Sequence, residues 1–295
     1  MAHGTPTAPS GIEAFYTRIR HGHSPTPEQL ADLTRRYQAI GGTSPLAQHT
    51  ADQVAGLAAT LHATSPGKYD VRYGSKFEPP LLEEAAATFR EEGFARVVGL
   101  VLAPHSSTMS TDQYMDRARS ALGDGVEFIT IGAWYRTPGF LELIAKRVNN
   151  AMATIAPSRY VTTEVLFSAH SLPIKILKLG DTYPEQLGES AQLAAKLAGV
   201  PSFDVAWQSA GRTPDPWIGP DILDVLRDKA ANGFTDVVSC PIGFVSDHLE
   251  VLFDVDIEAQ SVAREVGLNL VRTASLNDDP AFLSVLARVV ETAAA

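Results

Sequence analysis

Short apolar runs alternate with longer amphipathic segments along most of the chain. Apolar residues that recur every three or four positions predict helices near 10–20, 27–40, 47–62, 80–91, 111–122, 138–153, 184–198, 220–231, 246–265 and 280–293. Runs rich in β-branched and aromatic residues predict strands at 96–104, 127–134, 163–169, 203–209 and 235–242. Because strands separated by helices form βαβ units, this order predicts an α/β protein with parallel sheets flanked by helices.

One ionisable residue stands directly after a predicted strand. His170 follows the run 163–169, and a turn marked by Pro173 comes next. In parallel sheets ligands bind beyond the carboxyl ends of the strands, so His170 is a candidate for chemistry. A histidine that is merely hydrogen-bonded beneath a turn is the alternative, and a structural role is what we expect of His105 and His248.

Two sequence patterns occur once in each half of the chain, in the same order. The stretches 2-AHGTP-6 and 169-AHSLP-173 both read Ala-His-x-x-Pro, and 37-YQAIGGTSP-45 resembles 207-WQSAGRTPD-215. Such a repeat predicts two related α/β domains that face one another across a cleft, with the boundary between residues 155 and 156. A strand precedes Ala-His in the second half, so the first domain is expected to lack its matching first strand.

An acidic row runs through the segment 246–260, which we expect to be helical. Glu250, Asp254 and Glu258 are spaced four apart and therefore lie on one helix face, with Asp247 close to the same stripe. Like charges at this spacing cost about 0.2–0.5 kcal/mol per pair in water. The row is therefore either a solvated acidic face or a site for a cation, and an adjacent imidazole would favour iron, zinc or nickel.

Composition narrows the class of protein. The 295 residues carry a net charge of −10, which argues against nucleic acid and anionic membranes as main partners. The apolar runs are shorter than the ~20 residues that span a bilayer, so we expect a cytoplasmic protein without a stable membrane anchor. The single cysteine, Cys240, excludes an internal disulfide and a four-cysteine cluster.

Longer motifs carry a family resemblance. They are 168-SAHSLP-173, 207-WQSAGRTPDPWIGPDI-222 and 241-PIGFVSDHLEVLFDVDIE-258, together with 15-FYTRIRHG-22, 36-RYQAIGGTSPL-46 and 101-VLAPHSST-108. On these motifs the chain resembles the ferrochelatase family, most closely the soluble coproporphyrin III ferrochelatases of Gram-positive bacteria. The resemblance implies the type I chelatase fold. In that fold two Rossmann-like domains, here 1–155 and 156–295, enclose a porphyrin cleft, and we expect the last helix to pack back on the first domain.

The resemblance also implies roles for individual residues. His170 and Glu250 would be the catalytic pair and would contact the metal, with Asp254 and Glu258 forming a line for metal delivery. The implied porphyrin contacts are His3, Arg20, Arg36, Tyr37, Thr43, Ser44 and Tyr114. His3 stands where soluble relatives often carry a tyrosine that ligates the product iron, and histidine is itself a competent haem ligand.

The implied reaction is the insertion of Fe2+ into coproporphyrin III to give coprohaem. Porphyrin and ferrous iron would be its substrates, and we expect a monomer without a prosthetic group or an iron–sulfur cluster. Three alternatives remain open: a protoporphyrin IX ferrochelatase, a non-catalytic tetrapyrrole carrier, and a chelatase for another metal and macrocycle.

Overall fold

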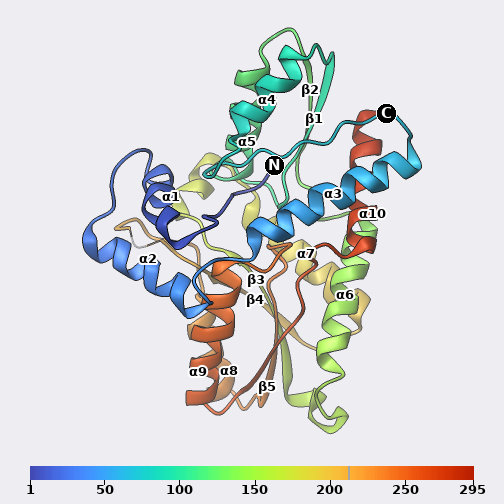
Figure 1. Ribbon diagram of the computed structural model, residues 1–295. Coiled ribbons are helices and arrows are strands. Elements are labelled where there is room, and N and C mark those ends of the chain that lie inside the picture. Colours follow the sequence, from blue (N-terminus) through green and yellow to red (C-terminus); the bar gives the residue numbers. More distant parts are fainter. Residues whose placement is uncertain (212) are drawn as a thin grey trace.

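The computed structural model describes residues 1–211 and 213–295, and it is an α/β protein with two parallel sheets (Figure 1). The strands are β1 (Arg96–Leu100), β2 (Glu127–Ile131), β3 (Thr163–His170), β4 (Phe203–Gln208), β5 (Asp236–Cys240) and β6 (Asn269–Arg272). The α-helices are α1 (Ile12–Ile19), α2 (Pro27–Ala39), α3 (Leu46–Thr64), α4 (Leu82–Glu91), α5 (Thr111–Leu122), α6 (Pro138–Met152), α7 (Tyr183–Ala198), α8 (Ile222–Ala231), α9 (Gln260–Glu265) and α10 (Pro280–Ala294). Three short 3-10 helices (Pro9–Gly11, Pro157–Thr162, Ile174–Leu179) and a π-helix, η4 (Val251–Ala259), complete the regular structure. The predicted fold class is confirmed.

The second half of the chain forms a four-stranded sheet in the order β4-β3-β5-β6. Its central strand, β3, is buried along its length except at the final residue, His170. Helices α6 and α7 cover one face of this sheet, and α8 and α9 cover the other (Figure 1). Because both of its faces are covered, the strand is mostly apolar in its middle, at residues 165–167, and again at Ala169 directly before His170.

In the first half, β1 pairs with β2 in parallel register. The two halves repeat one another: α4 and α8 begin 140 positions apart (82 to 222), and so do β1 and β5 (96 to 236). Each of these helices is preceded by a backbone bond of the same kind, from the Ser75 amide to the Pro80 carbonyl and from the Trp207 amide to the Pro220 carbonyl, both 2.9 Å. This shared geometry supports the internal duplication inferred from the sequence.

The last helix, α10, packs against α3 and α6 and also contacts β1 and β2 (Figure 1). Phe282 and Leu286 are fully buried there, in a core that also contains Leu57 and Ile131 from the first half and Phe167 from the second. The two sheets therefore share one apolar core. Within the part of the chain described, no helix is both long and apolar enough to cross a membrane.

Two expectations about local structure were wrong. The strand β6 was not anticipated, because its four residues, Asn269–Arg272, are too short to show an alternating pattern. The helix expected over 246–265 begins at Leu249 and then takes the π form over Val251–Ala259. Asp247 therefore precedes the helix, and its carboxylate bonds to Ser275 and Asn277 instead of extending the acidic row.

Candidate active site

His170 and Glu250 meet at the carboxyl edge of the larger sheet. β3 ends at His170, and Glu250 stands in the first turn of the helix that follows β5. Nε2 of His170 lies 3.4 Å from Oε1 of Glu250, although the two residues are 80 positions apart (170 to 250). Their side chains are 32% and 34% exposed, so both remain accessible to a substrate. The topology thus unites the two residues expected to carry the chemistry.

Neighbouring groups fix the orientation of the His170 ring. Nδ1 lies against the Ser171 carbonyl, and since a carbonyl only accepts, Nδ1 carries a proton and donates it. Nε2 is thereby directed at Glu250. The Tyr183 hydroxyl donates to the His170 carbonyl at 3.0 Å, and the Trp217 ring centre lies 6.4 Å from that of the imidazole.

The pair is an ion pair at neutral pH. Burial lowers the pKa of His170, but the Glu250 charge, the hydrogen bond with Glu250 and the Ser171 carbonyl together raise it to about 9. Burial raises the pKa of Glu250, and the charge and hydrogen bond of His170, helped by His248, bring it well below its ordinary value. One imidazolium and one carboxylate thus face the solvent together.

His248 is a third member of this cluster, and the sequence analysis assigned it only a structural role. Its Nε2 lies 3.6 Å from Oε2 of Glu250, while its Nδ1 lies 2.9 Å from the Ser246 carbonyl. The available signal was its position two residues before Glu250 in the stretch Asp-His-Leu-Glu. By contrast, His105 is buried and bonds to Ser190 Oγ at 2.7 Å, the structural role expected of it.

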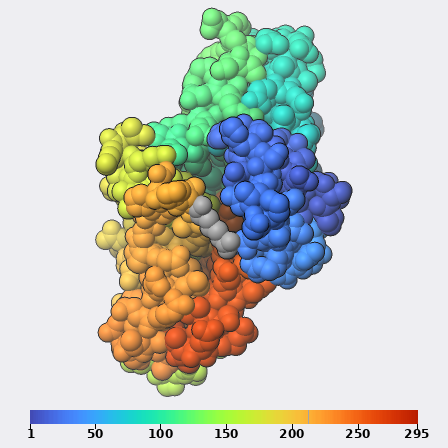
Figure 2. All heavy atoms as spheres, turned by 90° about the vertical axis from the view of Figure 1, so that its left-hand side faces the viewer, coloured from blue at the N-terminus to red at the C-terminus, as the bar shows by residue number. Residues whose placement is uncertain are grey.

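Asp254 continues the acidic row into a hollow of about 120 Å³. The hollow is lined by residues of both halves, among them Arg36, Ser209, Asp254 and Glu258. Viewed from this side, Figure 2 shows a hollow between the first residues of the chain, coloured blue, and an orange part of the second half. Residues of both halves of the chain therefore line this hollow, as expected for a cleft between them.

The carboxyl of Asp254 is strongly perturbed. It accepts hydrogen bonds from Ser209 Oγ and, at 3.3 Å, from Nη1 of Arg36. Burial and the charge of Glu250 raise its pKa to about 7, although Ser209 and Arg36 act in the opposite direction. Within the described residues, no three histidine, cysteine, aspartate or glutamate side chains converge tightly enough to hold a metal ion. The acidic residues form a row and not a closed cage.

The expected porphyrin contacts occupy different environments. His3 and Thr43 are exposed, and Arg20 is half-buried with Nε donating to the His23 carbonyl at 3.3 Å. The surroundings of His3 lower its pKa by partial burial, and the negative charge of Glu250 partly offsets this lowering. The His3 ring therefore lies close enough to Glu250 for the two charges to interact. Ser44 is buried and accepts from the Leu46 amide.

The two tyrosines of that set are buried. The Tyr37 hydroxyl shares a hydrogen bond of 3.0 Å with Thr5 Oγ1, and burial raises its pKa to about 12. Tyr114 packs beside Leu82 and Met115 in a small apolar cluster. Because both side chains are buried, any contribution that they make to substrate binding is indirect.

Comparison with known proteins places the chain. Residues 1–294 match the family model "Ferrochelatase". The chain is 42% identical to the ferrochelatase of Herpetosiphon aurantiacus over 293 residues, which are 98% of this chain and 96% of that protein. It is 43% identical to the coproporphyrin III ferrochelatase of Halalkalibacterium halodurans (99% and 94% covered) and 42% identical to that of Bacillus subtilis (98% and 95% covered).

Solved structures with little sequence similarity share the fold. SirB from Bacillus subtilis aligns with a TM-score of 0.57 at 15% identity, covering 83% of this chain and 90% of that one. CbiX, the terminal enzyme of sirohaem biosynthesis in denitrifying bacteria, aligns with a TM-score of 0.54 at 16% identity, covering 84% and 93%. With its sequence matched from end to end, the chain belongs to the ferrochelatase family.

Proposed function

We propose that this protein inserts Fe2+ into coproporphyrin III to give coprohaem. Relatives named coproporphyrin III ferrochelatase are 42–43% identical to this protein over nearly the whole chain. The observation that carries the proposal is the meeting of His170 and Glu250, 3.4 Å apart and open to solvent. A base and a carboxylate facing one point are what metal insertion requires, because two pyrrole N–H protons must leave as the iron enters.

The protonation state of the pair sets the order of events. Since the pKa of His170 is about 9, the ring is charged at neutral pH and the pair already holds one proton. It must release this proton to water before it accepts one from a pyrrole nitrogen. The approach of a dication favours that release, because Fe2+ repels an imidazolium. Both side chains are about one-third exposed, so water reaches them.

The acidic row supplies oxygen ligands along the way to the pair. Glu250, Asp254 and Glu258 follow one another at intervals of four residues on η4 and the turn before it. Carboxylates replace the water shell of a divalent ion stepwise, so a row of them lowers the cost of dehydrating Fe2+. Here iron is a substrate in transit, and we propose no resident prosthetic group.

The periphery of the macrocycle needs cationic and hydroxyl partners. Coproporphyrin III carries four propionates, and guanidinium groups bind carboxylates in two-pronged geometry. We propose Arg20, Arg36 and Thr43 for these contacts, with His3 placed on the side of Glu250. Arg36 bonds to Asp32 and Asp254 in the structure, so it has to exchange these partners when a propionate binds.

The last part of the proposal concerns the domain organisation, oligomeric state and partners of the protein. We propose two domains, 1–155 and 156–295, that work as a cytoplasmic monomer on porphyrin and ferrous iron. The parallel β1–β2 and β4-β3-β5-β6 sheets support the division, and the net charge of −10 disfavours a nucleic acid or anionic membrane as partner.

The decisive experiment is an anaerobic insertion assay with coproporphyrin III and protoporphyrin IX side by side. We expect turnover of Fe2+ with coproporphyrin III and a lower kcat/KM with protoporphyrin IX, which has two propionates fewer. Preference for protoporphyrin IX would reassign the substrate. Tight porphyrin binding without turnover would make the protein a carrier, and activity only with another metal would make it a different chelatase.

A further inference from the structure

Gln208 is a buried polar residue at the end of β4, next to the His170–Glu250 pair. It pairs with His170 in the register of β3 and β4, so the two side chains leave the same face of the sheet. Ser168, two positions before His170, lies on that face as well. Towards the middle of the sheet this face carries Leu166 and Ala206, which pack in an apolar cluster with α8. The face is thus apolar at its centre and becomes polar beside the site.

Three polar groups of Gln208 contact the chain on both sides of the catalytic pair. Its side-chain oxygen accepts from Ser168 Oγ at 2.9 Å, and its backbone carbonyl accepts from the Ser171 amide at 2.7 Å. These two bonds bracket His170, which lies between Ser168 and Ser171 in the sequence. The side-chain nitrogen donates to the Glu250 carbonyl at 3.3 Å. One residue therefore connects the backbone around His170 with Glu250.

The bond to the Glu250 carbonyl supplies a constraint that the sheet itself does not provide. Glu250 lies ten positions after Cys240, the last residue of β5 (240 to 250), and belongs to no strand. A carbonyl only accepts, so the amide of Gln208 has one orientation, with its nitrogen towards Glu250 and its oxygen towards Ser168. The side chain has no exposed surface and uses both polar atoms inside the protein. It therefore acts on the catalytic pair and not on the substrate.

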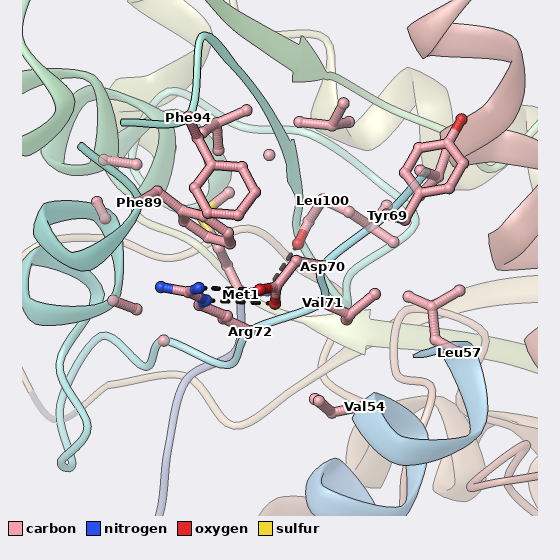
Figure 3. A pocket seen from close by; sticks show the side chains of 18 of the residues that line it. Met1, Val54, Leu57, Tyr69, Asp70, Val71, Arg72, Phe89, Phe94 and Leu100 are labelled. Atoms are coloured by element: carbon pink, nitrogen blue, oxygen red, sulfur yellow. Dashed lines mark hydrogen bonds and ion pairs between the residues drawn. The ribbon is translucent and has the colours of Figure 1, made fainter. Parts of the chain in front are cut away.

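The matching position of the first half shows that the fold does not require such a bridge. Ser75 and Trp207 make the same backbone bond to a proline carbonyl, so the residue that corresponds to Gln208 is Lys76. Lys76 is half-buried, and its Nζ donates to Gln113 Oε1 of α5 at 2.6 Å. The segment that leads to Lys76 borders a largely apolar hollow of about 270 Å³ (Figure 3). The buried amide is thus a feature of the half that carries the catalytic pair.

We propose that Gln208 is a positioning residue for metal insertion: it holds the Glu250 segment against the end of β3 and thereby sets the distance between Glu250 and His170. The proposal rests on the proposed function, because it gives Gln208 a part in that reaction. Insertion needs a base and a carboxylate that face one point, and a displacement of about 1 Å can cost about 10²-fold in rate.

The test replaces Gln208 by methionine, which has a similar length and no amide. The matched control is Gln186→Met, because Gln186 of α7 is also a buried glutamine whose amide bonds to backbone. It accepts from the Ser106 amide at 2.9 Å and donates to the Ser106 carbonyl at 3.2 Å. The readouts are the Tm, the distance from His170 Nε2 to Glu250 Oε1 in crystal structures, and kcat and KM for iron insertion.

We expect both variants to fold with a Tm lowered by about 5 °C, since each loses buried hydrogen bonds. Gln208→Met alone lengthens the Nε2–Oε1 distance by about 1 Å and lowers kcat by about 10²-fold, while KM for the porphyrin stays unchanged. An unaltered distance and kcat in Gln208→Met would overturn the proposal. Equal losses of kcat in the two variants would also overturn it, because they would follow stability and not position.

Ser168→Ala is a milder variant that removes only the hydroxyl group that orients the Gln208 amide. We expect a lower kcat, and we expect the double variant Ser168→Ala/Gln208→Met to be no slower than Gln208→Met, because Ser168 acts through Gln208. Additive losses would contradict this order. If Gln208→Met does not fold, Ser168→Ala decides alone, and an unaltered kcat in that variant would refute the proposal.

The distance readout separates this proposal from the proposed function, because it needs no turnover. If the unaltered protein inserts iron into neither porphyrin, the proposed function fails. The Nε2–Oε1 distance in Gln208→Met and Gln186→Met still decides whether Gln208 positions the pair.

Discussion

At neutral pH the shared proton of the His170–Glu250 pair resides on His170. The two side chains differ in whether a neighbouring residue could take over part of their role. Glu250 has His248 at 3.6 Å as a second hydrogen-bonding neighbour, whereas His170 is the imidazole at the end of β3. Glu258 lies eight positions after Glu250, beyond Asp254 in the acidic row. The chemistry therefore depends on His170 far more than on Glu258.

His170→Ala is expected to lower kcat/KM for Fe2+ insertion by about 10³-fold or more, the scale of a lost acid–base group. Glu258→Ala removes one carboxylate from the row and is expected to cost about tenfold, mainly at low Fe2+. Steady-state rates at several Fe2+ concentrations separate the two effects. Equal losses in both variants would refute this division of roles, and porphyrin binding by His170→Ala serves as the control for folding.

The pair also predicts a pH dependence of stability. The pKa of His170 is about 9 in the folded protein against an ordinary 6.5, so the folded state holds the proton more tightly. The resulting stabilisation is fully present below about pH 6.5 and is lost as the pH rises through 9. Because the pair is one-third exposed, we expect only about 1–2 kcal/mol across this range.

Urea unfolding between pH 6 and 9.5 measures this dependence. Glu250→Gln removes the partner charge and is expected to abolish the loss between pH 6.5 and 9 that the unaltered protein shows. Glu265→Gln, at an exposed position at the end of α9, is the control and should leave the loss unchanged. An unchanged profile in Glu250→Gln would show that the raised pKa does not come from this pair.

Among the elements, the turn after β5 packs directly against the end of β3. Gly243 lies so close to β3 that an added Cβ would be 2.4 Å from the Ala169 Cβ and 2.9 Å from its Cα. Its amide also donates to the Ser168 carbonyl. A side chain here must push β3 away, and Ala169 is the residue directly before His170. The position of the catalytic ring is thus tied to a glycine on another element.

Gly243→Ala is expected to destabilise the protein by about 1–3 kcal/mol through overpacking and to lower kcat by displacing His170. Gly188→Ala is the control, since nothing lies within 4 Å of a Cβ there and α7 gains a better helix former, worth about 0.5–1 kcal/mol. Urea unfolding and insertion rates measure both. A Gly243→Ala variant with unaltered stability and rate would contradict the close approach.

The elements also show how far the sequence leads. The apolar pattern predicted β3 and the position of His170, because a strand covered on both faces is apolar on both of them at its centre, here residues 165–167. It could not reveal that Val251–Ala259 is a π-helix, since carboxylates spaced by four share a face in either form. Nor could it reveal the role of His248, which depends on a turn that precedes the helix. Contacts made by loops have no periodicity to predict them.

For the molecule as a whole, the two halves share one core. Phe282 of α10 is fully buried, and its ring centre lies 6.0 Å from that of Trp134 in the first half. The same core includes Trp207 of β4, in the second half. Polar contacts join the halves as well, such as the 2.8 Å bond from Gln53 of α3 to Ser246. Although the sequence repeat predicts two domains, this packing predicts that the two halves unfold together.

Phe282→Ala is expected to cost about 3–5 kcal/mol, as fully buried phenylalanines do, and to lower the midpoint of unfolding equally in both halves. Fluorescence of variants that retain either Trp134 or Trp207, with the other tryptophans changed to phenylalanine, reports each half separately. The two urea transitions should coincide before and after the substitution, whereas Val161→Ala, at an 84% exposed position, should leave both unchanged. If instead Phe282→Ala shifts only the Trp134 transition, the halves are independent units and α10 belongs energetically to the first. Coincident transitions would mean that both halves are held by a single cooperative core, so that a substrate that binds the folded protein stabilises the entire chain and not one half of it.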